Sequence, residues 1–251
     1  MGREQVIAVT GASRGIGASI ALELARRGHR VGCLTRKGRG IEREAAVDDH
    51  AALAARMIPV RCDVEDEASV RQAFAALAAQ AGRIDGLVNN AGLHLDGKSA
   101  ELPTASFDRI MSVNARSVFV CAREVYPHLE AAGGTIVNIG SFFDKLGVKR
   151  NLAYCASKAA VGAITRCLAV EWAPKKIRVL DVAPGYIATE LNAAQRQGPL
   201  AAFLKARPEM SASLSLIVDA DLLTLLTAAE AAEVRAGRPT PNVTTPPDGA
   251  T

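Results

Sequence analysis

Short runs of apolar residues recur along the first 180 or so residues, and longer alanine-rich stretches separate them. Apolar runs of this length without polar alternation are typical of strands that are buried on both faces of a parallel sheet. The stretches between them have the length of crossover helices. We therefore predict strands at 6–10, 30–35, 57–62, 86–89, 135–139 and 177–182, and helices at 15–28, 41–55, 66–81, 104–130 and 151–173.

This alternation predicts an α/β fold with a doubly wound parallel sheet, three layers deep and Rossmann-like, in a single domain that we place at 1–237. Ligands of such sheets bind at the carboxyl ends of the strands, so the functional motifs should lie in the loops there. We expect a substrate loop at 186–215, with further helices at 188–206 and 219–235. The last 14 residues, 238–251, contain four prolines and predict a loosely ordered tail.

The composition excludes several classes of protein. Hydrophobic residues make up 49% and charged residues 22% of the 251 residues, as in a folded globular protein. The net charge of +4 is too small to indicate a nucleic-acid or membrane partner. Five scattered cysteines without a Cys-x-x-Cys spacing indicate neither a disulfide framework nor a metal site. Because we find no signal-like N-terminus and no apolar run of roughly 18 residues, we expect a cytoplasmic location.

A glycine-rich segment at 10–17, which we call the glycine loop, follows the first predicted strand and opens the first helix. Backbone N–H groups and the helix dipole at such a position can receive a pyrophosphate. The Gly-x-x-x-Gly-x-Gly spacing of Gly11, Gly15 and Gly17 differs from the usual dinucleotide fingerprint. A tight connection without a ligand is the structural alternative.

The end of the second strand indicates which dinucleotide binds. An NAD-selective site usually carries an acidic residue there, whereas this chain reads Thr35-Arg36-Lys37. The guanidinium of Arg36, helped by Arg14, would favour the 2′-phosphate of NADP through charge-assisted contacts. We therefore expect NADP(H) to be preferred and NAD(H) to be possible; a solvated basic turn is the alternative.

A second group of motifs lies further along the chain. Ser141 ends the fifth strand, and Tyr154 and Lys158 share one face of the next helix. A Tyr-x-x-x-Lys pair alone is weak evidence, because it also arises by chance. Together with the other motifs, however, the chain resembles the short-chain dehydrogenase/reductase family from residue 5 to about 190. The elements that carry the resemblance are Thr10 to Gly17, Asp63-Val64, Asn89-Asn90-Ala91-Gly92, Asn114, the Ser141, Tyr154 and Lys158 set, and Pro184-Gly185-Tyr186-Ile187-Ala188-Thr189.

The resemblance implies four catalytic residues. Tyr154 would be the acid and base, and Lys158 would lower its pKa and hold the nicotinamide ribose. Ser141 would donate a hydrogen bond to the developing alkoxide, and Asn114 would support a water relay to Lys158. The structural alternatives are a packed helix residue for Tyr154, a strand-end cap for Ser141 and a hydrogen bonder inside a helix for Asn114.

The resemblance also implies a cofactor site. Asp63 and Val64 would contact adenine, although Asp63 could also be a helix N-cap, and Asn90 could belong only to a strand-ending turn. The full set of expected cofactor-binding residues is Gly11, Ser13, Arg14, Gly15, Ile16, Gly17, Arg36, Asp63, Val64, Asn90, Ala91, Gly92, Tyr154, Lys158, Pro184, Gly185, Ile187 and Thr189.

These observations predict an NADP(H)-dependent oxidoreductase that interconverts a ketone and a secondary alcohol by hydride transfer, with Tyr154 as the acid and base. A small, mainly apolar substrate is expected from the residues near the site, which are Leu93, Leu95, Phe142, Phe143, Tyr186 and Leu191. We assign no role to His94, because a single loop histidine is usually incidental.

Two alternative functions stay open. The first is a 3-oxoacyl-(acyl-carrier-protein) reductase, for which only Lys175 and Lys176 offer docking charges. The second is a dinucleotide-binding sensor without catalysis, because a fold does not fix a function. The resemblance further implies a homodimer or homotetramer, because family members commonly pair the helices at 104–130 and 151–173; packing of the small residues of 151–173 within the subunit is the alternative. The C-terminal segment departs from the family, whose final strand would end in Asp-Gly-Gly; here it reads Pro246-Pro247-Asp248-Gly249.

Overall fold

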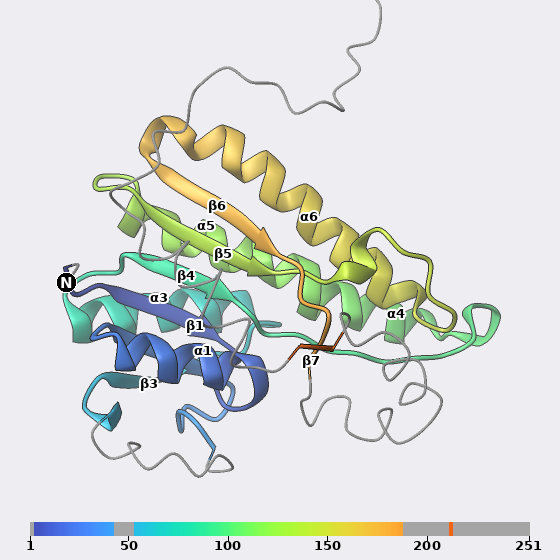
Figure 1. Ribbon diagram of the computed structural model, residues 1–251, viewed down its shortest axis with the longest axis horizontal. Helices are drawn as coiled ribbons and strands as arrows, with labels where there is room; N and C mark the ends of the chain where they lie inside the picture. Colours follow the sequence, from blue (N-terminus) through green and yellow to red (C-terminus); the bar gives the residue numbers. More distant parts are fainter. Residues whose placement is uncertain (1–2, 43–52, 188–210, 213–251) are drawn as a thin grey trace, which may run out of the picture.

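The computed structural model describes residues 3–42, 53–187 and 211–212, and its centre is a six-stranded parallel sheet (Figure 1). The strand order is β3-β2-β1-β4-β5-β6, so the chain reverses its direction of winding between β1 and β4. The predicted strands are confirmed to within one residue at each end. Their bounds are β1 Val6–Thr10, β2 Arg30–Thr35, β3 Met57–Arg61, β4 Gly86–Asn89, β5 Gly134–Ile139 and β6 Ile177–Val182.

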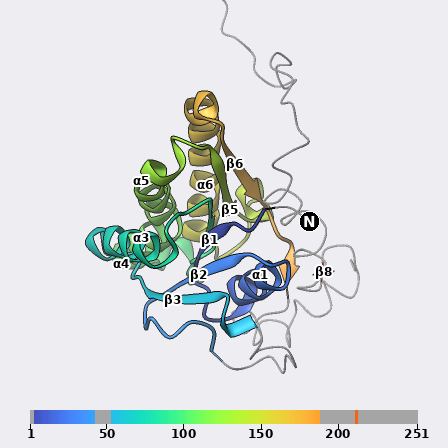
Figure 2. The same ribbon diagram turned by 90° about the vertical axis from the view of Figure 1, so that its left-hand side faces the viewer.

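Helices cover both faces of this sheet, as the doubly wound interpretation predicts. Helix α1 packs on one face, whereas α3, α5 and α6 pack on the other (Figures 1 and 2). The structure therefore has the three expected layers. The helices are α1 Gly15–Arg26, α3 Glu67–Ala81, α4 Thr104–Met111, α5 Ser117–Leu129 and α6 Leu152–Trp172, with short 3-10 turns at η1 Ser99–Glu101, η3 Phe142–Asp144 and η4 Ala173–Lys175.

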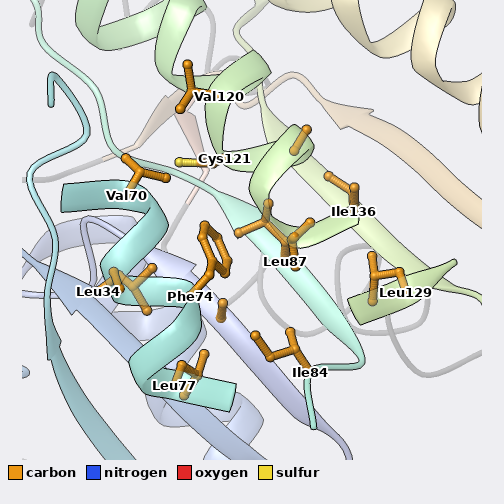
Figure 3. Close-up of a cluster of buried hydrophobic side chains, with 14 of the residues drawn as sticks. Leu34, Val70, Phe74, Leu77, Ile84, Leu87, Val120, Cys121, Leu129 and Ile136 are labelled. Atoms are coloured by element: carbon orange, nitrogen blue, oxygen red, sulfur yellow. The ribbon is translucent and has the colours of Figure 1, made fainter. Parts of the chain in front are cut away.

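The core lies on both sides of the sheet because successive strand residues point to opposite faces. In β1, Ala8 packs toward α3 and α5, and its neighbours Ile7 and Val9 pack toward α1. Phe74 of α3 lies at the centre of the larger cluster, next to Leu87 of β4 (Figure 3). This burial on both faces explains why the strands read as continuous apolar runs in the sequence.

The helix predicted at 104–130 differs from the observed one at its centre. A π-helical turn, η2 Ser112–Arg116, separates α4 from α5 and contains the buried Asn114. Such single π turns occur mostly at functional positions. Apolar periodicity continues through the turn, so the sequence pattern alone does not reveal it.

Other predictions fall partly or wholly outside the described residues. These are most of the helix at 41–55, the helices at 188–206 and 219–235, the tail at 238–251 and most of the substrate loop at 186–215. Within that loop, two short parallel strands were not predicted, β7 Tyr186–Ile187 and β8 Ser211–Ala212. Each of these strands has only two residues, which is too short for an apolar pattern that would predict it. Among the described helices, none is both long and apolar enough to cross a membrane.

Candidate active site

A cavity of about 710 Å³ extends along the carboxyl ends of the parallel strands. We call it the cleft. Its position agrees with the rule for open α/β sheets, because loops after all six strands contribute to it. The expected site residues that line the cleft are Gly11, Ser13, Arg14, Gly15, Ile16, Arg36, Asp63, Val64, Asn90, Ala91, Gly92, Ser141, Tyr154, Lys158, Pro184 and Gly185.

Four expected residues stand apart from this lining. Gly17 and Asn114 are buried behind the cleft and are not part of its wall. Ile187 belongs to β7, but the structure does not describe its side chain, and Thr189 lies outside the described residues. The predicted roles of Ile187 and Thr189 therefore stay predictions.

Hydrogen bonds join the glycine loop to the loop after β4. Asn90 Nδ2 donates to the carbonyl oxygens of Thr10 at 3.0 Å and Gly11 at 3.3 Å. In return, Thr10 Oγ1 accepts from the backbone N–H groups of Asn90 and Ala91, each at 3.0 Å. A Cβ added at Gly17 would lie 2.4 Å from Asn90 Nδ2, so only glycine allows this close approach. Asn90 and Gly17 thus hold the two loops in place.

The N-terminus of α1 faces the cleft without a side-chain cap. Arg14 is the N-cap residue and makes no capping hydrogen bond, and the first turn carries no acidic residue. Unpaired N–H groups and the positive end of the helix dipole suit an anionic ligand group at this position. The Ser13 carbonyl accepts from Glu42 N at 2.7 Å, which ties the glycine loop to the segment after β2.

Basic side chains gather at the end of the cleft next to β2. Arg14, Arg36, Lys37 and Arg39 all line it, and all four are exposed. Lys37 is paired with Glu42 at 3.5 Å. Arg39 was not predicted, because it lies beyond the strand end; the turn at Gly38, with φ of 65°, brings it back to the cleft.

Asp63 lines the cleft but does not cap a helix. Its backbone N–H donates to Ser69 Oγ at 2.9 Å, and its Oδ1 accepts from Glu65 N at 3.1 Å. Helix α3 begins later, and its N-cap is Asp66, which accepts from Ala68 N at 3.0 Å. The N-cap alternative for Asp63 is therefore wrong, because the helix starts three residues further along the chain.

Ser141, Tyr154 and Lys158 come together at the other end of the cleft. Ser141 follows β5, is buried, and accepts a hydrogen bond from Phe143 N at 3.2 Å as the N-cap of η3. Lys158 Nζ donates to the Ile139 carbonyl oxygen at 2.7 Å and lies 5.6 Å from the centroid of the Tyr154 ring. Strand β5 and helix α6 thus place a hydroxyl, a phenol and an amine around one space.

Burial changes the pKa values of both ionisable groups in this set. Burial raises the pKa of Tyr154, and the hydrogen bond with Ser141 opposes this rise. The sequence analysis expected Lys158 to lower the Tyr154 pKa. The net shift in the structure is upward, because burial outweighs the other influences and the Lys158 amine is bound to the Ile139 carbonyl. Burial also disfavours the charged form of Lys158 and so lowers its pKa to about 8; the Asp181 carboxylate opposes this fall.

Asn114 makes its hydrogen bonds within the protein. Its Oδ1 accepts from Leu93 N at 2.7 Å, and its Nδ2 donates to Leu93 O at 2.9 Å and to Ser157 Oγ at 3.0 Å. Ser157 Oγ in turn donates to the Tyr154 carbonyl oxygen at 2.7 Å. The π turn therefore ties the loop after β4 to the first turns of α6, which carry Tyr154. The water relay proposed for Asn114 stays a prediction.

The ring of Tyr154 is held between two other rings. His94 lies 4.8 Å away with an interplanar angle of 80°, and Phe143 lies 5.8 Å away at 86°. A hydrogen bond between His94 Nε2 and Asn151 Oδ1, at 2.5 Å, orients the histidine. The sequence analysis gave His94 no role, because nothing in the sequence places a loop residue against a tyrosine 60 positions later.

Of the apolar residues expected near Tyr154, Leu93 lines the cleft, whereas Leu95 lines a separate pocket and Phe142 and Phe143 do not form the cleft wall. Phe143 is buried, and Leu95 is 37% exposed. Phe142 packs against Phe143 at 4.6 Å. The side chain of Tyr186 and all of Leu191, which were expected here, lie outside the description.

Comparisons with known proteins agree with this geometry. A family model described as "short chain dehydrogenase" matches residues 5–199. The chain is 40% identical over 192 residues to 2-(R)-hydroxypropyl-CoM dehydrogenase of Xanthobacter autotrophicus, covering 75% of this chain and 76% of that protein. It is 34% identical over 235 residues to D-threitol dehydrogenase of Mycolicibacterium smegmatis, covering 90% of each. A crystal structure of a short-chain type dehydrogenase/reductase from Mycobacterium marinum superposes with a TM-score of 0.79 at 32% identity, over 90% of this chain and 89% of that one.

Proposed function

The chain belongs to the short chain dehydrogenase family, and on that premise we propose that it transfers a hydride between NADP(H) and a small, mainly apolar ketone or secondary alcohol. Its family makes it an oxidoreductase that acts on CH–OH groups and binds NAD or NADP. The finer proposal has three parts: Tyr154 as acid and base, a preference for NADP, and an apolar substrate.

The observation that carries the proposal is the meeting of Ser141, Tyr154 and Lys158 at one end of the cleft. Reduction of a ketone requires a proton donor within hydrogen-bond reach of the carbonyl oxygen. Because burial raises its pKa, the Tyr154 phenol keeps its proton at neutral pH and suits this role. Ser141 Oγ accepts from Phe143 N, and its hydroxyl is hydrogen-bonded with Tyr154, so it lies beside the proton donor and can turn to the same carbonyl oxygen.

The described residues fit a dinucleotide. The cleft is long enough to reach from the loop after β2 to Tyr154, and the uncapped N-terminus of α1 lies between these ends. The glycine loop would hold the pyrophosphate there, and Lys158 would hold the nicotinamide ribose. When bound, the nicotinamide supplies the hydride, which no side chain can provide.

Lys158 supports Tyr154 in both directions of the reaction. Its amine, fixed on the Ile139 carbonyl, faces the Tyr154 ring at 5.6 Å. In alcohol oxidation Tyr154 must lose its proton, and a nearby ammonium favours the resulting phenolate. Because the pKa of Tyr154 is raised, we expect ketone reduction at neutral pH; alcohol oxidation should gain as the pH rises, until the Lys158 ammonium, with a pKa of about 8, loses its proton.

The preference for NADP rests on charge. Arg14, Arg36 and Arg39 line the cleft beyond β2, where a 2′-phosphate would lie. Arginine suits a phosphate because its planar fork can form two parallel hydrogen bonds. The carboxylate of Glu42 at this end is paired with Lys37.

The carrier-protein alternative is not favoured by the position of its docking charges. Lys175 and Lys176 lie in the connection from α6 to β6, whereas Tyr154 lies at the opposite end of α6 (Figure 1). At 1.5 Å per residue, the length of α6 from Tyr154 to Trp172 is about 27 Å. A carrier docked on these lysines would sit far from the phenol.

One experiment separates the candidate functions. The chain would be given NADPH or NADH with cyclic ketones, a free 3-oxo ester and a carrier-bound 3-oxoacyl group, and nicotinamide absorbance would be followed. We expect NADPH to be consumed with free ketones. Consumption only with the carrier-bound group would favour the carrier-protein reductase. Binding of NADPH, seen by its fluorescence, without consumption on any carbonyl would favour the sensor.

We also propose a homodimer or homotetramer. The outward side of α6 carries small residues at Ala159 and Ala163 and the 79% exposed Val170, and α5 carries the 43% exposed Phe119. Apolar side chains on two helices suit an interface between copies. Light scattering tests this proposal: Val170→Glu should lower the observed mass, whereas a monomeric parent chain would contradict it.

A further inference from the structure

Asp181 is a half-buried acidic residue of β6 that does not line the cleft. It lies on β6 opposite Asn138 of β5, and its Oδ1 is buried without a hydrogen-bond partner among the described residues. Unpaired buried carboxylate oxygens are rare because the charged form loses its hydration. This unpaired oxygen therefore indicates that Asp181 has a functional role.

The backbone next to Asp181 is shaped around its carboxyl group. A Cβ added at Gly140 would lie 2.3 Å from Asp181 Oδ1 and 2.9 Å from Oδ2, so a larger residue would displace this carboxyl group. Gly140 separates Ile139, whose carbonyl oxygen accepts from Lys158 Nζ, from Ser141. The carboxyl group of Asp181 thus lies against the backbone segment that holds two of the three active-site groups.

Charged groups from two other elements face Asp181. Helix α6 carries Lys158 one turn before Gly162 and on the same face, and a Cβ added at Gly162 would lie 3.7 Å from Asp181 Oδ2 and 3.4 Å from Arg166 Nη1. The η3 segment contributes Asp144, whose Oδ2 lies 3.8 Å from the same point. It also contributes Lys145, which directly follows η3.

We propose that Asp181 is a positioning residue that acts through Lys158: its carboxylate keeps the Lys158 ammonium charged inside the protein and supports the segment from Ile139 to Ser141. This proposal rests on the proposed function of Lys158 and extends the active site by one residue. Asp181 does not line the cleft, so it would not touch the substrate.

The electrostatic influences agree with this arrangement. Burial lowers the pKa of Lys158, and Asp181 is the group that opposes this fall. Burial also raises the pKa of Asp181, as does the neighbouring Asp144 carboxylate. The Lys158 charge, the Gly140 backbone and Lys145 act in the opposite direction. Asp144 therefore acts on Asp181, and Asp181 acts on Lys158.

This order of influences gives a matched pair of variants. Asp181→Asn keeps the shape of the side chain and removes its charge, so Lys158 should lose its proton at a lower pH. Asp144→Asn makes the same chemical change in the same cluster. We expect it to leave Lys158 unchanged, because the loss of the Asp144 charge favours the ionised form of Asp181, which is the form that acts on Lys158.

The direct measurement is the titration of the Lys158 amine in the full chain. Trace labelling with acetic anhydride at a series of pH values, read by mass spectrometry of the peptide that contains Lys158, reports this titration without substrate or dinucleotide. We expect a midpoint near the value of about 8 in the parent chain. In Asp181→Asn the midpoint should fall by roughly one pH unit. In Asp144→Asn it should not move.

The second measurement is the pH profile of kcat/KM for ketone reduction. Its alkaline limb should move to lower pH in Asp181→Asn and stay in place in Asp144→Asn. Asp181→Ser is a second neutral variant with a smaller side chain, in case the amide does not fit against Gly140. A folded neutral variant that labels with the parent midpoint overturns the proposal. If no carbonyl is reduced by the parent chain, the proposed function fails, and the labelling result still decides the role of Asp181.

Discussion

At the end of the cleft near β1 and β2, the side chains of Arg14, Arg36 and Arg39 are charged and exposed. At the end near β5 and α6, Lys158 is only 5% exposed and one oxygen of Asp181 is fully covered. Solvent and salt screen the first group, so its members act mainly through their summed charge. Burial changes the pKa values of the second group, so each member affects the protonation of its neighbours.

This difference teaches where single substitutions should matter. Each exposed arginine contributes part of the positive charge at this end, so the loss of one should mainly change the affinity for NADP. A buried group acts through a particular hydrogen bond, such as that of Lys158 Nζ to the Ile139 carbonyl oxygen at 2.7 Å. Its loss should change the rate, the pH dependence or the stability.

The largest expected effect is that of Tyr154→Phe at the buried end. The phenyl ring keeps the contacts with His94 and Phe143 but has no proton to donate. We expect kcat to fall by roughly 10²–10⁴-fold, the usual contribution of a general acid, while NADPH binding stays nearly intact. Steady-state kinetics and NADPH fluorescence measure the two quantities.

Tyr126→Phe is the matched control for that change. The Tyr126 ring packs on Trp172 at 4.8 Å, away from the cleft, so its hydroxyl should not matter for turnover. If Tyr154→Phe kept the turnover of the parent chain, the buried end would not hold the proton donor, and the comparison between the two ends would fail.

Lys158→Met tests the buried end through stability. Burial lowers the pKa of Lys158 to about 8 in the folded chain, and the value returns to about 10.4 on unfolding. Between these pH values the unfolded chain holds a proton that the folded chain lacks, so the contribution of Lys158 to stability rises with pH. From pH ~7 to pH ~10.5, the unfolding free energy of the parent should rise by roughly 3 kcal/mol relative to the variant.

Urea unfolding of both chains at several pH values measures this difference. Taking the difference between the two chains cancels the shared groups on which Lys158 does not act. A difference that does not change with pH would mean that Lys158 is not held in a low-dielectric environment.

Arg36→Asp tests the exposed end. Hydrogen bonds to charged groups contribute about 1.5–3 kcal/mol, so we expect KM for NADPH to rise by roughly tenfold or more. KM for NADH should change much less, because NADH carries no 2′-phosphate. Lys175→Asp makes a similar charge change on an exposed side chain remote from the cleft and should alter neither value. Equal effects of Arg36→Asp on both cofactors would remove the assignment of Arg36 to NADP.

The two ends also differ in how far the sequence predicts them. The strands and the glycine loop were predictable because burial on both faces produces continuous apolar runs, as in Val6–Thr10. Tyr154 and Lys158 were predictable because one helix carries both at a fixed spacing. The exposed charge of Arg36 follows directly from its place after β2.

The buried surroundings of Tyr154 were not predictable in the same way. His94 contacts Tyr154 across 60 positions of sequence, and the carboxyl group of Asp181 lies against Gly140 of another strand. Such contacts depend on how loops and strands pack, and the spacing of apolar residues along one helix or strand carries no information about that. The π turn at Asn114 is hidden for a related reason, because one extra residue in a turn hardly disturbs the apolar pattern of the helix.

The smallest expected effect separates two aspartates at the exposed end, Asp63 and Asp66. Asp66 caps α3 by accepting from Ala68 N at 3.0 Å, is exposed, and does not line the cleft. Asp66→Ala should therefore lower the unfolding free energy by about 1 kcal/mol and leave KM for NADPH unchanged. Asp63 lines the cleft, so Asp63→Ala should instead raise that KM. Unfolding curves and cofactor titrations of both variants measure these effects. If Asp66→Ala raised KM for NADPH and Asp63→Ala did not, Asp66 and not Asp63 would be the residue that contacts the cofactor.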